Sequence, residues 1–290
     1  MTGRDVNTET AWAEGRVTVL RRALESAATS TDGVWGFAVR ERGETVVSVN
    51  GDVAMRAAST IKVPLLILAL QDVAAGHREL SDVLVVPGER VGGAGVLRLM
   101  PSVRQLRLDE TLELMIGVSD NNAANMVIDM LGVDDAAARI TALGARSTHL
   151  GRRLYDVEAM RAGLDNVTTA DDQALLLGLL GSTGLLPDDL RTIALDILGR
   201  QQFNDRIPAA LGPDIVCRHK TGELAGVRHD VGILEFDGRS VVFTALGSGL
   251  TDPASQSGGT GVAGAVIATA ARAVVDIARS DSDLLTQSDL

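Results

Sequence analysis

Three short motifs in this sequence carry groups that can do chemistry when they meet: Ser59-Thr60-Ile61-Lys62, Ser119-Asp120-Asn121 and Lys220-Thr221-Gly222. The first offers a hydroxyl nucleophile with an amine three residues away. The second offers a hydroxyl beside an amide, and the third a cation beside a hydroxyl. Each motif alone is common, but all three in this order are specific. The set predicts acyl transfer through an active-site serine.

The segment from residue 59 to about residue 75 predicts a buried helix, because residues 63 to 70 are almost all apolar. Residues three apart share a helix face, so the Lys62 amine can reach the Ser59 hydroxyl. The alternative is a serine cap followed by an ordinary lysine, but an ammonium group inside an apolar helix is costly. Burial lowers the pKa of a lysine and so provides a neutral amine as a base. We therefore interpret Ser59 as the nucleophile, with its own backbone N–H at the helix N-terminus as an oxyanion donor.

The ordered set resembles the class A β-lactamase-like serine hydrolases, over about residues 15 to 280. The resemblance implies that Ser119 passes a proton toward the leaving nitrogen. It also implies that Asn121 holds the amide side chain of the substrate and that Asp120 braces the loop. Taken alone, these three residues also fit a turn that caps a helix.

The Lys-Thr-Gly motif follows an apolar strand. Lys220 supplies a positive field, Thr221 a hydroxyl for a substrate carboxylate, and Gly222 room for a ligand backbone. The resemblance implies that the second oxyanion donor is the backbone N–H of Glu223. It also implies an arginine that anchors the substrate carboxylate on the following strand. Arg228 lies near that place, and His229 competes for it.

The loop before Thr168 departs from the class A pattern. Class A enzymes carry a glutamate there that activates the deacylating water. Counting forward without gaps from Leu143, the expected position holds Leu154, which cannot act as a base. Asp156 and Glu158 are candidate replacement bases, and the alternative for both is a solvated helix face. Turnover of the acyl-enzyme is the step that the sequence leaves open.

The pattern of elements predicts an α+β fold, an α/β sandwich. Strands at 34–41, 45–50, 215–219, 230–236 and 240–247 form one antiparallel sheet from N- and C-terminal segments, flanked by helices at 14–30 and 261–279. Amphipathic helices at 108–118, 121–131, 134–143, 168–180 and 188–198 form an inserted all-helical lobe. We expect a single domain over residues 15–280, with an α/β lobe at about 15–58 and 208–280 and the helical lobe at about 59–207. Residues 1–14 and 281–290 are expected to be disordered tails.

Composition narrows the possible partners. A net charge of −11 and a sequence pI of about 4.8 argue against nucleic acid or an anionic membrane surface, since both favour clustered basic residues. Cys217 is the only cysteine, so no internal disulfide forms, and its apolar neighbours predict a buried strand thiol. No cluster has metal-ligand spacing, so we expect no metal and no cofactor.

We expect the protein to be located in the cytoplasm, because residues 1–16 contain three acidic residues where a secretory signal would be basic and then apolar. No stretch was expected to stay apolar for the roughly 20 residues that span a bilayer. The oligomeric state cannot be predicted from these features.

The predicted function is that of a class A β-lactamase-like serine hydrolase, which forms an acyl-enzyme on Ser59 and hydrolyses a β-lactam or a related small amide or ester. Two alternatives remain at this point. One is an esterase or peptidase that acts on a different acyl substrate. The other is a protein that binds β-lactams without turnover, which Leu154 favours and the intact motifs disfavour.

Overall fold

The computed structural model describes residues 12–257 and 261–280. Most of the two predicted tails lies outside the described residues, at 1–11 and 281–290. Glu14, where the predicted tail and the predicted helix 14–30 overlap, is the first residue of helix α1 (Glu14–Thr29).

One five-stranded sheet forms the centre of the fold, in the order β2-β1-β9-β8-β7 with every neighbouring pair antiparallel. Because the chain leaves this sheet after β2 and returns at β7, the sheet joins segments more than 150 residues apart in sequence. The strands are β1 (Val34–Glu41), β2 (Glu44–Val49), β7 (Val216–Leu224), β8 (Val227–Phe236) and β9 (Arg239–Ser248).

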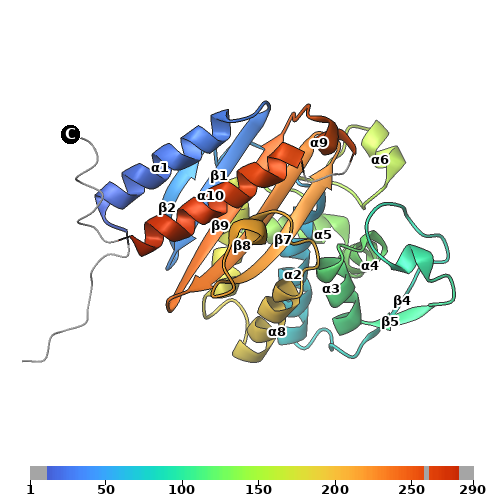
Figure 1. Cartoon of the computed structure of the whole chain (residues 1–290). Coiled ribbons are helices and arrows are strands. Elements are labelled where there is room, and N and C mark those ends of the chain that lie inside the picture. The colour runs from blue at the N-terminus through green and yellow to red at the C-terminus, as the bar shows by residue number, and fades with distance from the viewer. Residues whose placement is uncertain (1–11, 258–260, 281–290) are drawn as a thin grey trace, which may run out of the picture.

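Helices α1 and α10 (Gly261–Arg279) lie side by side over one face of the sheet (Figure 1). The core beneath them contains Trp35, Phe37 and Phe243, whose rings stack at centroid distances of 5.9 and 6.3 Å. These side chains come from alternate positions of β1 and from β9, so the period-2 alternation of strands delivers them to one face. They anchor the terminal helices to the sheet.

A helical lobe is inserted between β2 and β7, and helix α2 (Lys62–Ala74) is its centre. Every residue from Lys62 to Leu70 is buried, so this helix is covered on all sides. Helix α7 (Ala170–Gly181) packs on the other face of the sheet. The remaining long helices of the lobe are α3 (Leu108–Gly117), α4 (Asn121–Leu131), α5 (Val133–Ala142) and α8 (Asp188–Gly199). The predicted α+β fold class is confirmed.

The short elements escaped prediction, because two to five residues carry no readable periodicity. They are the strand pairs β3 (Met55–Arg56) with β6 (Val167–Thr168) and β4 (Val83–Val85) with β5 (Gln105–Arg107), the helices α6 (Val157–Arg161) and α9 (Pro253–Ser257), and the 3-10 turns η1 (Ala58–Ile61), η2 (Leu97–Leu99) and η3 (Ile207–Ala210).

Two predicted boundaries near the motifs were wrong. Ser59 does not begin an α-helix: it lies in η1, and α2 starts at Lys62. The Lys-Thr-Gly motif does not follow the strand but lies inside β7, which continues to Leu224. Backbone pairing with β8 extends the strand through this polar segment, and apolar patterning cannot reveal that.

The expectation of no membrane-length apolar segment also needs correction. Among the described residues, α10 is long and apolar enough to cross a bilayer, with a mean hydropathy of 1.6 over its window. However, 56% of that window is buried inside the protein, which is typical of a core helix.

Candidate active site

Ser59 lies in a tight turn that places it over the start of α2. The preceding residue, Ala58, has a φ of 48°, in the left-handed region that alanine rarely adopts. Thr60 closes the turn by donating its hydroxyl proton to the Ala57 carbonyl at 2.6 Å. In a 3-10 turn residues i and i+3 eclipse each other. The turn therefore brings Lys62 Nζ to 3.2 Å from Ser59 Oγ.

The Lys62 amine is fully buried and has four oxygen neighbours. It donates to the backbone carbonyl of Ser119 at 2.6 Å and to Asn121 Oδ1 at 2.8 Å, and it lies 3.1 Å from Ser119 Oγ. The carbonyl and the amide oxygen can only accept. A neutral amine that gives its two N–H groups to them keeps its lone pair for a hydroxyl. The geometry thus suits an amine that takes a proton from Ser59.

Ser119 connects the two lysines of the site. Its Oγ lies 3.1 Å from Lys62 Nζ and 3.0 Å from Lys220 Nζ, and its backbone φ is 55°. The left-handed conformation carries a cost for serine and often marks functional positions. Ser119 is 4% exposed, so its hydroxyl has the two amines as close neighbours and little access to bulk water.

Burial perturbs both amines, and neighbouring charges add to its effect. Burial, with the Lys220 charge as the second cause, holds the pKa of Lys62 well below its ordinary value. Burial also lowers the pKa of Lys220 to about 7, where Asp230 opposes the shift and Arg206 adds to it. The sequence contains 27 basic residues, and only these two are lysines. All the others are arginines, which do not give up a proton near neutral pH. The whole supply of titratable amine side chains is therefore placed in this site.

Asp120 holds together the loop that carries Ser119. Its carboxylate caps α4 and also fixes the glycine-rich segment opposite, by accepting four backbone N–H groups, from Val96, Leu97, Asn122 and Ala123, at 2.7 to 3.1 Å. Gly95, with a φ of +112°, lies so close that a Cβ would clash with this carboxylate. The bracing role that the resemblance implied for Asp120 agrees with these contacts.

The side chain of Asn121 makes two hydrogen bonds within the protein. Its Oδ1 accepts from Lys62, and its Nδ2 donates to the Gly92 carbonyl at 3.1 Å. An amide nitrogen has two protons, so one remains for a substrate carbonyl. The glycine-rich loop 91–95 lies against this residue.

Strand β7 brings the third motif to the nucleophile. It is an edge strand of the sheet, and it packs against η1. A Cβ on Gly222 would meet Thr60 Cγ2 and His229 Cβ at 3.1 Å, so only glycine lets the strand approach the turn this closely. Thr221 lies next to Lys220 on the same strand. Glu223, whose backbone N–H we predicted as an oxyanion donor, follows Gly222 and is 38% exposed at its side chain.

Two buried arginines, Arg206 and Arg228, lie close to β7. Arg206, which we did not select, is 3% exposed and donates to the carbonyls of Gly222 at 3.0 Å and His229 at 2.9 Å. It also pairs with Glu223 at 2.5 Å. It precedes η3 in a polar loop, where no motif signals its role. Arg228, the predicted carboxylate anchor, is fully buried and donates to the carbonyls of Leu224, Val227 and Ala254.

His229, the competitor of Arg228, is a neutral structural residue. Burial lowers its pKa to about 4. Its Nδ1 accepts from the Gly247 N–H at 3.2 Å, so its Nε2 carries the proton and donates to the Arg56 carbonyl at 2.9 Å.

The loop before Thr168 carries Leu154, the residue that the count along the sequence assigned to the position of the class A glutamate. The backbone of Leu154 is latched to Asn125, which accepts from its N–H at 2.8 Å and donates to its carbonyl at 3.0 Å. The leucine side chain packs on the core of the helical lobe. Asp156 caps α6 by accepting from the Ala159 N–H at 2.9 Å, and Glu158 is exposed. Within the described residues, neither carboxylate contacts Ser59 or Lys62.

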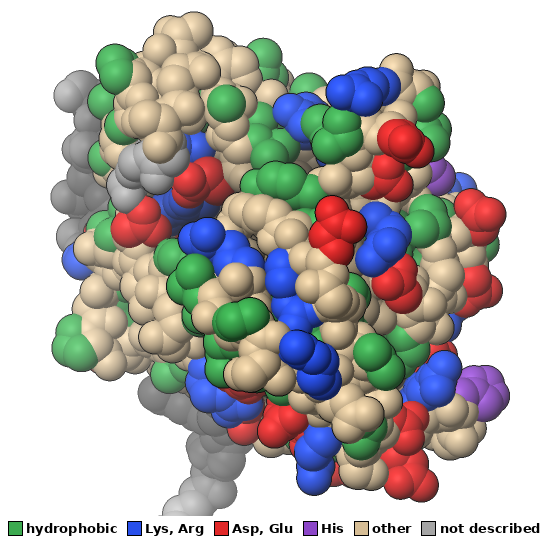
Figure 2. All heavy atoms as spheres, turned by 90° about the vertical axis from the view of Figure 1, so that its right-hand side faces the viewer, with side chains coloured by type: hydrophobic (Ala, Val, Ile, Leu, Met, Phe, Trp, Pro, Cys, Tyr) green, Lys and Arg blue, Asp and Glu red, His purple; other side chains and the backbone are tan. Residues whose placement is uncertain are grey.

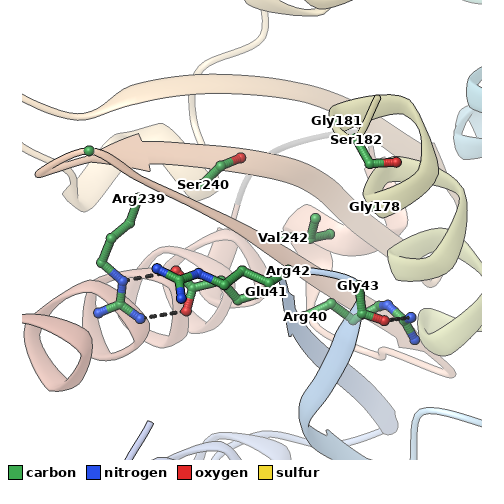
Figure 3. A pocket seen from close by; sticks show the side chains of 11 residues that line it. Arg40, Glu41, Arg42, Gly43, Gly178, Gly181, Ser182, Arg239, Ser240 and Val242 are labelled. Carbon is green, nitrogen blue, oxygen red and sulfur yellow. Dashed lines mark hydrogen bonds and ion pairs between the residues drawn. The ribbon is translucent and has the colours of Figure 1, made fainter. Parts of the chain in front are cut away.

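A cavity of about 290 Å³ lies elsewhere, at the β1–β2 turn and the end of α7 (Figure 3). None of the motif residues lines it. Arg239 pairs there with Glu41 at 2.7 Å, and Arg40 donates to Thr45 at 2.9 Å. Gly178 and Ser182 bring the C-terminal end of α7 to the same cavity, and a helix C-terminus favours cations such as these arginines. We therefore interpret this cavity as the space between the arginines and the C-terminal end of α7, and not as part of the candidate active site.

Other expected features have modest roles. Cys217 is partly buried on β7, where we predicted a buried thiol, and burial raises the pKa of its thiol well above the ordinary value. In the part of the chain that the structure describes, no group of three His, Cys, Asp or Glu side chains is placed to hold a metal ion. The face on the right of Figure 1 carries several basic side chains near its centre, although the chain as a whole is acidic (Figure 2).

Comparison with known proteins agrees with this geometry. The sequence matches the β-lactamase enzyme family over residues 19–278. This chain belongs to that family. A curated β-lactamase of Streptomyces albus G is 30% identical over 181 residues, which are 59% of this chain and 54% of that protein.

Solved structures show the same fold over nearly the whole domain. A β-lactamase from Sphaerobacter thermophilus DSM 20745 is 30% identical, with a TM-score of 0.77 over 90% of this chain and 97% of its own. The protein PBP-A is 28% identical, with a TM-score of 0.77 over 89% and 95%. An ancestral class A β-lactamase is 24% identical and shares the fold, with a TM-score of 0.78 over 89% and 99%.

Proposed function

We propose that this member of the β-lactamase family is a serine hydrolase that forms an acyl-enzyme on Ser59 with a β-lactam. The observation that supports this most strongly is the Lys62 amine, which is fully buried and lies 3.2 Å from Ser59 Oγ with its two acceptor-only neighbours already in place. A lysine in such a place serves as a general base.

The proposed acylation moves one proton around the site. Ser59 Oγ attacks the lactam carbonyl carbon while its proton passes to Lys62 Nζ, and backbone N–H groups of Ser59 and Glu223 stabilise the oxyanion. The C–N bond of the ring then breaks. Lys62 returns the proton through Ser119 Oγ, 3.1 Å away, to the leaving nitrogen. Lys220 supports Ser119, and the positive field of Lys220 and Arg206 suits the carboxylate of a β-lactam.

We further propose that deacylation is slow for good penicillins. The Leu154 side chain cannot activate water, and its backbone is held by Asn125. A solved leucine-to-glutamate variant of PBP-A, 27% identical to this chain, is an acyl-enzyme complex with penicillin G. That relative supports penicillin as an acylating ligand. The second candidate function, penicillin binding without turnover, rests on the same leucine.

The decisive experiment is intact mass spectrometry over time after mixing the protein with a penicillin, a cephalosporin and a p-nitrophenyl ester. We expect a β-lactam adduct within seconds to minutes that persists for minutes or longer, with a burst of product and then a slow steady state. Ser59→Ala is the control and should carry no adduct. An ester that turns over while both β-lactams leave the protein unmodified would favour the esterase alternative.

The deacylating base can be tested with Asp156→Asn and Glu158→Gln. If either carboxylate activates water, its variant should lengthen the adduct lifetime by at least about tenfold. If wild type hydrolyses penicillin rapidly without a burst and neither substitution slows it, the proposal of slow deacylation fails.

A further inference from the structure

Tyr155, the only tyrosine of the chain, stands beside the substrate amide site in an unusual conformation. Its φ is 61°, in the left-handed region, and 51% of its side chain is exposed. A bulky residue in this region is uncommon, and such strain persists only where the surroundings enforce it.

Hydrogen bonds at both neighbours of Tyr155 enforce this conformation. On one side, Asn125 exchanges two hydrogen bonds with the backbone of Leu154, at 2.8 and 3.0 Å. On the other side, Asp156 caps α6 through the Ala159 N–H at 2.9 Å. The Tyr155 backbone is thus fixed from both neighbours, and only its side-chain torsions are free to adjust.

The ring leans over the glycine-rich loop next to Asn121. A Cβ on Gly92 would touch the ring at 3.6 Å. A Cβ on Gly93 would clash with the Tyr155 hydroxyl and would also lie 2.6 Å from Asn121 Nδ2. The loop therefore makes room for the ring by lacking side chains. As a result the phenol ends close to the amide nitrogen that has a proton available for the substrate.

The same short segment is unusually apolar on its surface. Val157, Met160 and Leu164 are 51%, 44% and 49% exposed, so the chain downstream of Tyr155 also exposes apolar side chains. A side chain that is rigid, aromatic and half-exposed offers contact area at little entropic cost.

Resting on the proposed function, we infer that Tyr155 is the wall on which the acyl side chain of the substrate packs. A carbonyl that receives the Asn121 Nδ2 proton carries its substituent away from the reacting ring, past this phenol. The substrate class is then an acyl donor whose amide bears an aryl or other large apolar group. Tyr155 is a specificity residue and takes no part in the chemistry.

The test compares two penicillins that differ only in the side chain, penicillin G with a benzyl group and its analogue with a methyl group. The measured quantity is the ratio of their second-order acylation rates at Ser59, from stopped-flow mixing and intact mass. Wild type should prefer the benzyl compound by about tenfold or more. Tyr155→Ala should reduce the ratio to within about threefold of unity by slowing only the benzyl compound.

Two further variants separate the ring from the hydroxyl and from general damage. Tyr155→Phe should keep the wild-type ratio, because stacking needs the ring and not the oxygen. Val85→Ala removes another exposed apolar side chain, 71% exposed on β4, and should also keep the ratio. Labelling of Ser59 by a small fluorophosphonate should be equal in all variants.

Two results would overturn the inference: an unchanged ratio in Tyr155→Ala, whether or not both penicillins slow equally, or loss of the preference in Tyr155→Phe. If Tyr155→Ala fails to fold, the ratio in Tyr155→Leu decides in its place and should fall below that of Tyr155→Phe. If wild type is acylated by neither penicillin, the proposed function itself has failed, which is a different outcome from a lost preference.

Discussion

Replacing Lys220 by methionine should stabilise the protein near neutral pH and remove part of the pH dependence of its stability. The Lys220 amine is fully buried, and burial lowers its pKa from 10.5 to about 7. The folded state therefore holds this proton less tightly than the unfolded chain. The resulting penalty on folding is complete below pH 7, fades as the pH rises, and is gone above about 10.5.

The magnitude follows from the shift. One pKa unit corresponds to about 1.4 kcal/mol, so the penalty declines by about 2 kcal/mol between pH 7 and pH 8.5. Wild type should gain that amount in its free energy of unfolding over this range, beyond what other groups contribute. Lys220→Met lacks this group and also removes the charge that helps to lower the pKa of Lys62. The Lys220 contribution alone should make the stability difference between the two proteins shrink by about 2 kcal/mol.

Urea unfolding followed by circular dichroism at four pH values from 7 to 8.5 measures this difference. The sequence permits a direct check, because protein labelled with isotope only at lysine shows the side chains of Lys62 and Lys220 alone in an NMR titration. One of the two signals should titrate near pH 7 and should be absent in Lys220→Met. A stability difference that stays constant within about 0.5 kcal/mol, or a Lys220 midpoint above pH 9, would refute the reasoning.

Three further outcomes are expected. Lys62→Ala should slow acylation of Ser59 by at least about 100-fold, and Lys62→Arg should not restore the rate, because a guanidinium keeps its proton. Near-normal acylation rates in either variant, measured by intact mass, would exclude Lys62 as the base. Cys217→Ser should leave the acylation rate unchanged, since the thiol is protonated and packed against the sheet, so a loss of rate at constant melting temperature would contradict its structural role. Asp120→Ala should lower the free energy of unfolding by at least about 3 kcal/mol, because four backbone N–H groups lose their acceptor. If calorimetry finds the free energy of unfolding lowered by less than about 1 kcal/mol, water replaces the carboxylate as the acceptor.

The sequence by itself determined the family, through its ordered motifs, and most of the long elements. Residues 34–41 and 261–279 matched the strand β1 and the helix α10 in full, because hydrophobic periodicity is strong over such lengths. The spacing of Ser59 and Lys62 was informative for a similar reason. A separation of three residues brings side chains together in any helical turn, whether it is 3-10 or α.

Tertiary structure decided what depends on residues far apart in the chain. The burial of Arg206 behind Gly222, the latch between Asn125 and Leu154, and the position of Tyr155 over Gly93 each join segments that no local pattern connects. The pKa shifts of Lys62 and Lys220 belong to the same class. They arise because two lysines 158 residues apart are buried beside one hydroxyl, and burial is a property of the assembled fold rather than of either motif.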